Sequence, residues 1–160
     1  MKDHFEIEFV IKSSPSLLYQ YLFTPSGLSE WFADNVNSRS DKYEFFWDDS
    51  SEEALLIKNK ANEFVRYQWQ SDEDDFEKYH FEMRIQVDEI TKDVSLIVSD
   101  FADEDEVEES KMFWENQISN LKQTPFANQM RQYNGTKMDI LMFLCTLTGA
   151  LTHVGSKLGQ

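Results

Sequence analysis

Residues 14–32 read SPSLLYQYLFTPSGLSEWF, and this stretch decides the fold of the chain. Ser14 can accept a backbone N–H as a helix cap, and Pro15 suits a first helical turn. Apolar residues then recur at helical spacing until the sequence TPSG at 24–27 interrupts the pattern. Residues 28–32 supply a second short helix. The stretch is therefore predicted to form two short helices separated by a Pro-Ser-Gly break.

On both sides of this stretch the apolar period changes to two, which is typical of strands with one buried face. Before it, apolar side chains alternate with polar ones from Phe5 to Ile11. After it, the alternating runs are residues 36–47, 53–60, 65–69, 79–87 and 94–99. Short polar turns separate these runs. They predict an antiparallel meander with one face in solvent.

A long amphipathic helix is predicted after the last strand. Asp103 and Glu106 have the spacing of a capping box, and acids there face the positive end of the helix dipole. The apolar stripe of this helix is Val107, Trp114, Ile118 and Leu121. Pro125 ends the helix or its extension. A helix laid across a curved antiparallel sheet, with two short helices, is a helix-grip α+β fold.

Length and charge restrict the function classes. A chain of 160 residues predicts one main domain, and its net charge of −15 argues against binding to nucleic acid or to anionic membranes. Cys145 is the single cysteine, so no internal disulfide is expected, which suits a reducing, cytoplasmic compartment. The first residues, MKDHFE, contain no apolar core of a signal peptide.

The chain resembles the START-like superfamily at residues 14–19 and 24–32, at YEFFW (43–47) in the sheet, and at Trp114 in the final helix. The resemblance covers about residues 3–123 and is greatest to homologues of the heat-shock-chaperone ATPase activator. It implies a cavity between the sheet and the long helix. Members of this superfamily carry out ligand transfer, cyclisation and co-chaperone functions, so the resemblance predicts the fold and does not select an activity.

The implied cavity defines the candidate ligand site. Its expected lining residues are Trp31, Phe32, Trp47, Trp69, Phe81, Trp114 and Ile118. Trp31 and Phe32 are expected near its mouth, and Tyr67 and Tyr79 are also expected to point inward. The aromatic side chains have two interpretations, an apolar pocket for a small hydrophobic ligand or a filled core.

No catalytic residue, metal site or cofactor is predicted. His4 and His80 are expected on outward faces of their strands, and no histidine has the spacing of a metal ligand. Cys145 and His153 do not share a helical face. The acidic runs at 71–75 and 100–109 lack the pattern of a calcium loop, and no Gly-rich phosphate loop or Gly-x-Ser-x-Gly elbow occurs.

Two function classes follow from these observations. The first is a non-enzymatic START-like domain that binds a small hydrophobic ligand in the cavity between sheet and helix. The alternative is a protein-interaction module, similar to a co-chaperone, whose acidic surface contacts a partner in a salt-sensitive way. An enzyme is the third class, and it requires polar groups that converge inside the cavity.

The C-terminal residues 124–160 have a different composition and are treated as an extension of the domain formed by residues 1–123. Three basic residues and one acid give the extension a charge of +2, which leaves −17 for the domain. The apolar run at 138–154 is shorter than the roughly 20 residues of a membrane span. Three interpretations stay open: a helix packed on the domain or on a second copy, a membrane span, and an end foreign to the domain. The contact stripe of such a helix is Ile140, Leu144, Leu147 and Leu151.

Overall fold

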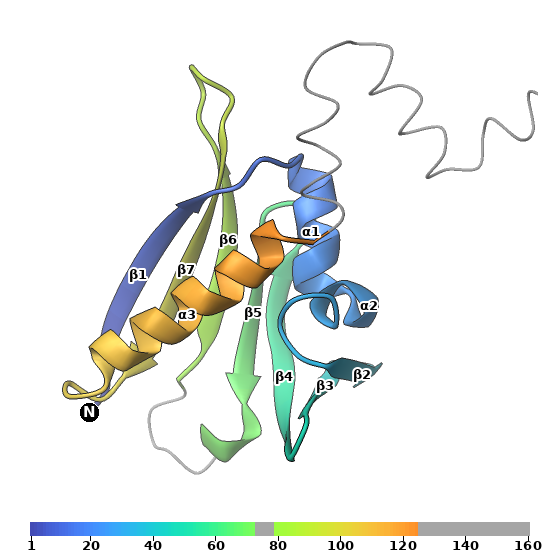
Figure 1. Ribbon diagram of the computed structural model, residues 1–160, viewed down its shortest axis with the longest axis vertical. Helices are drawn as coiled ribbons and strands as arrows, with labels where there is room; N and C mark the ends of the chain where they lie inside the picture. The colour runs from blue at the N-terminus through green and yellow to red at the C-terminus, as the bar shows by residue number, and fades with distance from the viewer. Residues whose placement is uncertain (73–78, 125–160) are drawn as a thin grey trace, which may run out of the picture.

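The computed structural model describes residues 1–72 and 79–124, and its core is a seven-stranded antiparallel sheet crossed on one face by a long helix (Figure 1). In chain order the elements are β1 (Asp3–Val10), α1 (Pro15–Phe23), α2 (Pro25–Leu28), β2 (Asn35–Arg39), β3 (Lys42–Trp47), β4 (Ser50–Lys60), β5 (Phe64–Trp69), a 3₁₀ turn (Gln70–Asp72), β6 (Phe81–Val87), β7 (Val94–Ala102) and α3 (Val107–Lys122). The helix-grip α+β fold is therefore confirmed.

The sheet order is β1-β7-β6-β5-β4-β3-β2. Strands β2 to β7 follow one another as hairpins, and β1 joins β7, with Phe9 opposite Leu96. We call the face covered by α3 the inner face. Its fully buried side chains include Phe45, Ala54, Val65, Tyr67, Phe81, Met83, Leu96 and Val98. The period of two seen in the sequence therefore corresponds to burial on this face.

The decisive stretch forms its two helices at slightly different positions from those predicted. The Ser14 side chain caps α1 by accepting the N–H of Leu17, as expected. The second helix was predicted at 28–32, but α2 is Pro25–Leu28 and the following residues form turns. Thr24 explains the shift, because it ends α1 and its side-chain oxygen accepts the N–H of Gly27, so it caps α2 at the same time.

Gly27 permits the close contact between these two helices. A Cβ atom at this position would lie 2.7 Å from the Cα atom of Tyr21 and would overlap the backbone oxygen of Gln20. Both neighbours belong to the backbone of α1 and cannot move aside. The glycine predicted to interrupt a helix therefore lies inside α2, where the absence of a side chain is required for packing.

The long helix begins later than predicted. The proposed capping box at Asp103 and Glu106 is wrong, because α3 starts at Val107 and Glu106 makes no side-chain capping bond. Instead the backbone N–H of Glu106 donates to the carbonyl of Asp103 at 2.8 Å, which forms a turn that redirects the chain from β7 across the sheet. The predicted stripe is confirmed, since Trp114, Ile118 and Leu121 are buried.

The opposite, outer face of the sheet carries an ion-pair network. Arg66 donates to Oε2 of Glu82 from Nε and Nη2 at 2.9 and 2.6 Å, and Arg84 donates to Oε1 from Nε at 3.0 Å. Burial disfavours the charged carboxylate, but the hydrogen bonds from both arginines outweigh this effect and hold the pKa of Glu82 below its ordinary value. Phe64 lies under the Arg84 guanidinium, 4.8 Å from its ring centre.

Two predicted features fall beyond the described residues. Most of the acidic run at 71–75 lies there, as does the extension after Thr124, so the domain boundary at 123 stays a prediction. In the two described segments no helix is long and apolar enough to cross a membrane.

Candidate functional site

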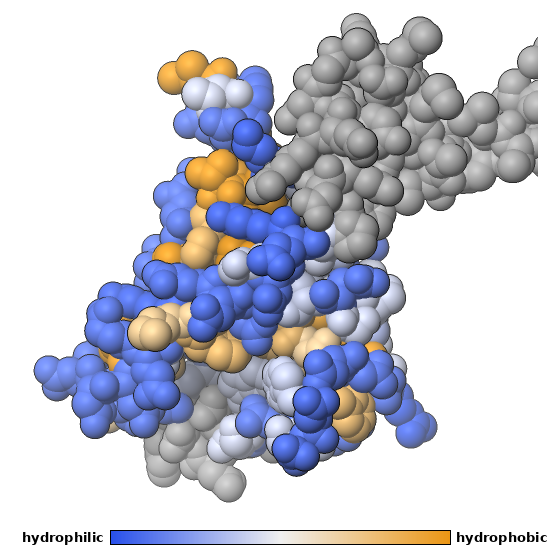
Figure 2. Space-filling view, viewed as in Figure 1, coloured by the Kyte–Doolittle hydropathy of each residue, from blue (hydrophilic) through white to orange (hydrophobic). Residues whose placement is uncertain are grey.

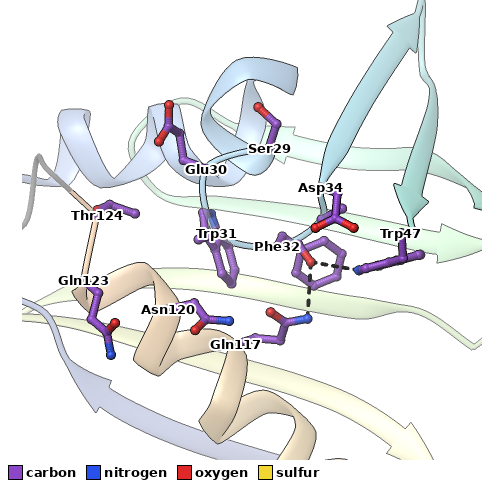
Figure 3. A pocket seen from close by; sticks show the side chains of 11 residues that line it. Ser29, Glu30, Trp31, Phe32, Asp34, Trp47, Gln117, Asn120, Gln123 and Thr124 are labelled. Carbon is purple, nitrogen blue, oxygen red and sulfur yellow. Dashed lines mark hydrogen bonds between the residues drawn. The ribbon is translucent and has the colours of Figure 1, made fainter. Parts of the chain in front are cut away.

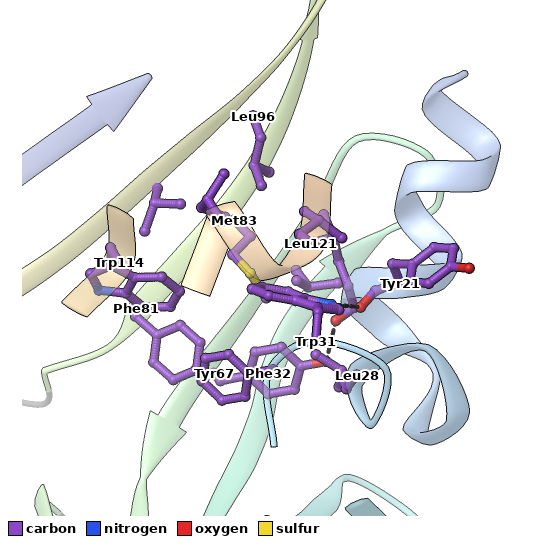
Figure 4. Packing of buried hydrophobic residues seen from close by; sticks show 14 of the residues in the cluster. Tyr21, Leu28, Trp31, Phe32, Tyr67, Phe81, Met83, Leu96, Trp114 and Leu121 are labelled. Atoms are coloured by element: carbon purple, nitrogen blue, oxygen red, sulfur yellow. Dashed lines mark hydrogen bonds between the residues drawn. The ribbon is translucent and has the colours of Figure 1, made fainter. Parts of the chain in front are cut away.

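Phe32 occupies the centre of the aromatic cluster between α3 and the inner face (Figure 4). Only 2 % of its surface is exposed. Its ring lies within 6.4 Å, centre to centre, of the rings of Trp31, Phe45, Trp47, Trp69, Phe81, Phe113 and Trp114. The residue comes from the loop after α2, so a side chain of the protein itself fills this part of the helix-grip interior.

The polar atoms of the core aromatics bind backbone carbonyls. The hydroxyls of Tyr67 and Tyr43 donate to the carbonyls of Leu22 and Phe23, both at 2.8 Å, in the last turn of α1. These carbonyls have no partner within the helix. Burial raises the pKa of Tyr67 well above its ordinary value, so this phenol stays protonated and serves as a structural donor.

Beside this filled interior lies an open groove of about 590 Å³ (Figure 3). One wall is the loop after α2, another is Trp47 at the end of β3, and the third is the C-terminal part of α3. The lining residues are Ser29, Glu30, Trp31, Phe32, Ala33, Asp34, Trp47, Gln117, Asn120, Gln123 and Thr124. We call this feature the groove. Aromatic surface meets amides and carboxylates in it, as in many ligand sites.

The loop that forms one wall is held by backbone and side-chain hydrogen bonds. The carbonyl of Phe32 accepts from Nε1 of Trp47 at 3.3 Å and from Nε2 of Gln117 at 3.2 Å. Trp31 Nε1 donates to the Tyr21 carbonyl at 2.9 Å. The groove therefore has walls fixed by contacts between α1, β3 and α3, which lie far apart in the sequence.

Tyr21 links the groove to α1. Burial and the negative charge of Glu30 raise the pKa of Tyr21 to about 12, and a hydrogen bond with Thr124 offsets part of the rise. Glu30 and Thr124 both line the groove, whereas Tyr21 lies behind it on α1.

The predicted site residues divide into three groups. Trp31, Phe32 and Trp47 line the groove. Trp69 is partly buried and stacks on Phe32 at 6.4 Å. The others, Phe81, Trp114 and Ile118, are almost completely buried in the core. Their role in ligand binding stays a prediction.

Sequence reasoning missed the polar side of the groove. Gln117, Asn120 and Gln123 follow one another at intervals of three on α3, next to the apolar stripe, and this spacing was a usable signal. Glu30 and Asp34 flank the predicted Trp31 and Phe32, but no sequence pattern identified these two carboxylates as site residues.

Polar groups elsewhere are engaged in packing. Asp100 accepts the Nε1 hydrogen of Trp114 at 2.9 Å under α3.

Tyr79 was predicted to point inward, but β6 begins only at Phe81, and the Tyr79 ring packs on Phe101 of the outer face at 5.3 Å. His4 and His80 also pack on Phe101. Within residues 1–72 and 79–124, no group of three or more His, Cys, Asp or Glu side chains could hold a metal ion.

Comparison with known proteins agrees with this geometry. BfR322 from Bacteroides fragilis, known from its solution structure, is 31% identical, with a TM-score of 0.56 over 76% of this chain and 89% of that one. The solution structure of the Aha1 dimer from Colwellia psychrerythraea gives a TM-score of 0.63 at 16% identity, over 75% of this chain and 93% of that one. CalU16 from Micromonospora echinospora gives 0.61 at 12% identity, over 82% of each chain.

The last two proteins are too distant in sequence to show more than the fold, so the expected closeness to the chaperone-activator branch stays a prediction. No curated protein matches the chain. Residues 1–125 match the family description of a START-like superfamily domain. The chain therefore belongs to the START-like superfamily.

Proposed function

We propose that this START-like domain is a non-enzymatic binding protein that holds a small molecule with an apolar part in the groove. The observation that carries the proposal is an open space of about 590 Å³ that borders the aromatic interior: the partly exposed ring of Trp47 lines it, and behind it Trp31 and Phe32 are almost completely buried. A volume of this size suits a small ligand. The superfamily commonly binds hydrophobic ligands, which agrees with this use of the groove.

A deep cavity between the sheet and α3 was expected, but the ring of Phe32 fills this part of the interior, so the candidate ligand site is the open groove beside it. Trp69, Phe81 and Trp114 then act as the support behind the groove, because their rings contact that of Phe32, and Ile118 is buried in the same core. A ligand meets the partly exposed ring of Trp47 first.

The test uses the full chain and a hydrophobic fluorophore whose emission rises on binding, followed by displacement with candidate ligands. Asn120→Trp places a large side chain in the groove, whereas Asn116→Trp alters an equally exposed asparagine of α3 that does not line it. We expect Asn120→Trp to lose most of the fluorophore signal and Asn116→Trp to keep it. Equal binding by both variants would contradict the proposal.

An interaction function is the second candidate, and it rests on α3. Met112 and Phe113 are 62% and 44% exposed on this helix, among the acids Glu108, Glu109 and Glu115. Figure 2 shows that the surface on this side of the molecule is mainly hydrophilic, with few apolar areas. A partner with apolar and basic side chains would fit this pattern.

The experiment for this candidate is a salt-dependent association assay with wild type and Met112→Ser/Phe113→Ser. Association that is lost in the double variant and weakened by salt supports the interaction function. Association that neither the double substitution nor salt changes contradicts it. Self-association through the extension and a cytoplasmic location both stay predictions; the Aha1 protein of Colwellia psychrerythraea is a dimer in its solution structure.

A further inference from the structure

The hydroxyl and indole donors that line the groove form hydrogen bonds within the protein. Ser29 Oγ donates to the Ser26 carbonyl at 2.7 Å, and Thr124 Oγ1 donates to the Leu121 carbonyl at 2.8 Å. The indole N–H groups of Trp31 and Trp47 also donate to carbonyls, as described above. Four of the lining side chains that could donate to a ligand are therefore already engaged.

The backbone of the loop is engaged in the same way. The N–H groups of residues 30–33 donate to the carbonyls of Gly27 and Leu28, and the N–H of Asp34 donates to Phe46. Anion sites in proteins are built from free backbone N–H groups or from basic side chains. The loop offers no free N–H, and among the described residues that line the groove there is no Lys, Arg or His.

The groups that remain available accept hydrogen bonds or attract positive charge. Glu30 and Asp34 are exposed carboxylates at the rim, and neither forms an ion pair with another described residue. The C-terminal end of α3, which carries the partial negative charge of the helix dipole, forms the opposite wall. The ring of Trp47, which is partly exposed, can attract a cation as well, whereas Trp31 is almost completely buried.

The side-chain amides of Gln117, Asn120 and Gln123 line the groove and carry N–H donors. Each amide also presents an oxygen acceptor, so these side chains do not favour an anion over a cation. The charge preference of the groove therefore depends on the carboxylates, the helix end and the partly exposed ring of Trp47, which all act in the same direction.

We propose that the groove selects a ligand with an apolar, aromatic body and an ammonium or protonated amine group, and that it disfavours amphiphiles with carboxylate or phosphate heads. This inference rests on the proposed function, because it assigns a chemical class to the ligand of the same groove. It separates this chain from a general carrier of fatty acids.

The test compares three small probes with one skeleton and different charge: phenylpropylammonium, phenylpropanol and phenylpropanoate. Each is titrated into the full ¹⁵N-labelled chain at neutral pH. The chain has 4 tryptophans, and their indole N–H signals report position, since Trp31 and Trp47 line the groove while Trp114 is buried in the core. Trp→Phe variants assign the signals.

We expect the signals of Trp31 and Trp47 to shift more than that of Trp114, with the ammonium probe binding about tenfold more tightly than the carboxylate. In Glu30→Gln/Asp34→Asn this advantage should fall to about twofold. The control Glu8→Gln/Glu115→Gln removes the same charge from exposed sites outside the groove and should keep the preference.

The failures of the two proposals look different. If all three probes shift the groove signals with equal affinity, or the carboxylate binds most tightly, the charge preference is wrong and the binding function stands. If the control double variant loses the preference as fully as the groove variant, net charge is the cause and the assignment to the groove is wrong. If no probe shifts Trp31 or Trp47 up to its solubility limit, both proposals are wrong.

Discussion

The two faces of the sheet are stabilised by different physical effects. The inner face packs aromatic rings around Phe32 and sends tyrosine hydroxyls to the carbonyls of α1. The outer face, which lies opposite α3, holds Glu82 between Arg66 and Arg84. Packing of apolar surface itself involves no titrating charge, whereas an ion-pair network depends on pH and is screened by salt.

The contributions of the two faces to stability are therefore lost at opposite ends of the pH scale. The inner face contains tyrosines whose pKa values are raised, so its contribution weakens in alkaline solution. The outer face contains Glu82, whose pKa is lowered, so its contribution weakens in acid. Variants on each face can therefore separate the two contributions.

Phe32→Ala should have the largest effect. Removing a nearly buried ring from the centre of the cluster should lower the free energy of unfolding by about 3–5 kcal/mol. Denaturant unfolding measures this loss. Phe113→Ala is the control, because Phe113 touches the same cluster but is 44% exposed, and it should cost about 1 kcal/mol. Equal losses for the two variants would show that Phe32 is not the central packing residue.

Tyr67→Phe should come second. It removes a buried hydrogen bond to the Leu22 carbonyl and should cost about 1–2 kcal/mol at neutral pH. The folded state raises the pKa of Tyr67, so it binds the phenolic proton more tightly than the unfolded state does. Stability is thus complete below the ordinary value of 10.0 and falls as the pH rises above it.

The variant should therefore lose less stability than the wild type when the pH is raised through this range. Unfolding curves at a series of alkaline pH values provide the comparison. Parallel losses in the two proteins would mean that Tyr67 does not contribute to alkaline unfolding. The remaining decline in the variant is expected from Tyr21 and Tyr43, whose pKa values are also raised.

Glu82→Gln tests the outer face and should cost about 1–2 kcal/mol at pH 7, between the values for exposed and buried ion pairs. The folded state lowers the pKa of Glu82, so the carboxylate stabilises the fold above the ordinary value of 4.5. This contribution disappears as the pH falls through the lower pKa of the folded state. The difference in the free energy of unfolding between the wild type and Glu82→Gln should therefore shrink as the solution becomes more acidic.

The measurement is unfolding between neutral and acid pH. Glu6→Gln is the control, an exposed glutamate on the same face for which little change is expected. A pH-independent difference between wild type and Glu82→Gln would show that the network acts by packing alone.

Lys42→Ala should have the smallest effect. Lys42 and Glu53 form an outer-face pair at 3.1 Å, but their side chains are 48% and 40% exposed. Such pairs contribute about 0–1 kcal/mol and are screened by salt. We expect a loss below about 1 kcal/mol that vanishes in high salt, and a larger, salt-independent loss would place this pair among the packing contacts of the sheet.

The sequence predicted the elements of the fold because their signals are local. Alternation along β3, β5 and β7 and the stripe on α3 follow directly from which side chains are buried. The errors occurred at element ends. Thr24 caps α2 earlier than predicted, and the turn before Val107 replaces the expected cap, because tertiary contacts decide where a helix can start.

The candidate site was predicted only in part. Trp31, Phe32 and Trp47 were identified because large aromatics next to a loop are conspicuous in a sequence. The space behind them is filled because the ring of Phe32 lies in it, and periodicity contains no information on where a loop side chain packs.

By itself, the sequence determined a START-like helix-grip domain, its inner face and its acidic charge. Only the tertiary structure decided that the interior is filled at Phe32 and that an open groove lies beside it. The groove is formed by the loop after α2, β3 and the end of α3, and Gln117 reaches the Phe32 carbonyl across 85 residues of sequence. The preference that we propose for this groove depends on where each N–H points, and carbonyl positions in space determine that direction.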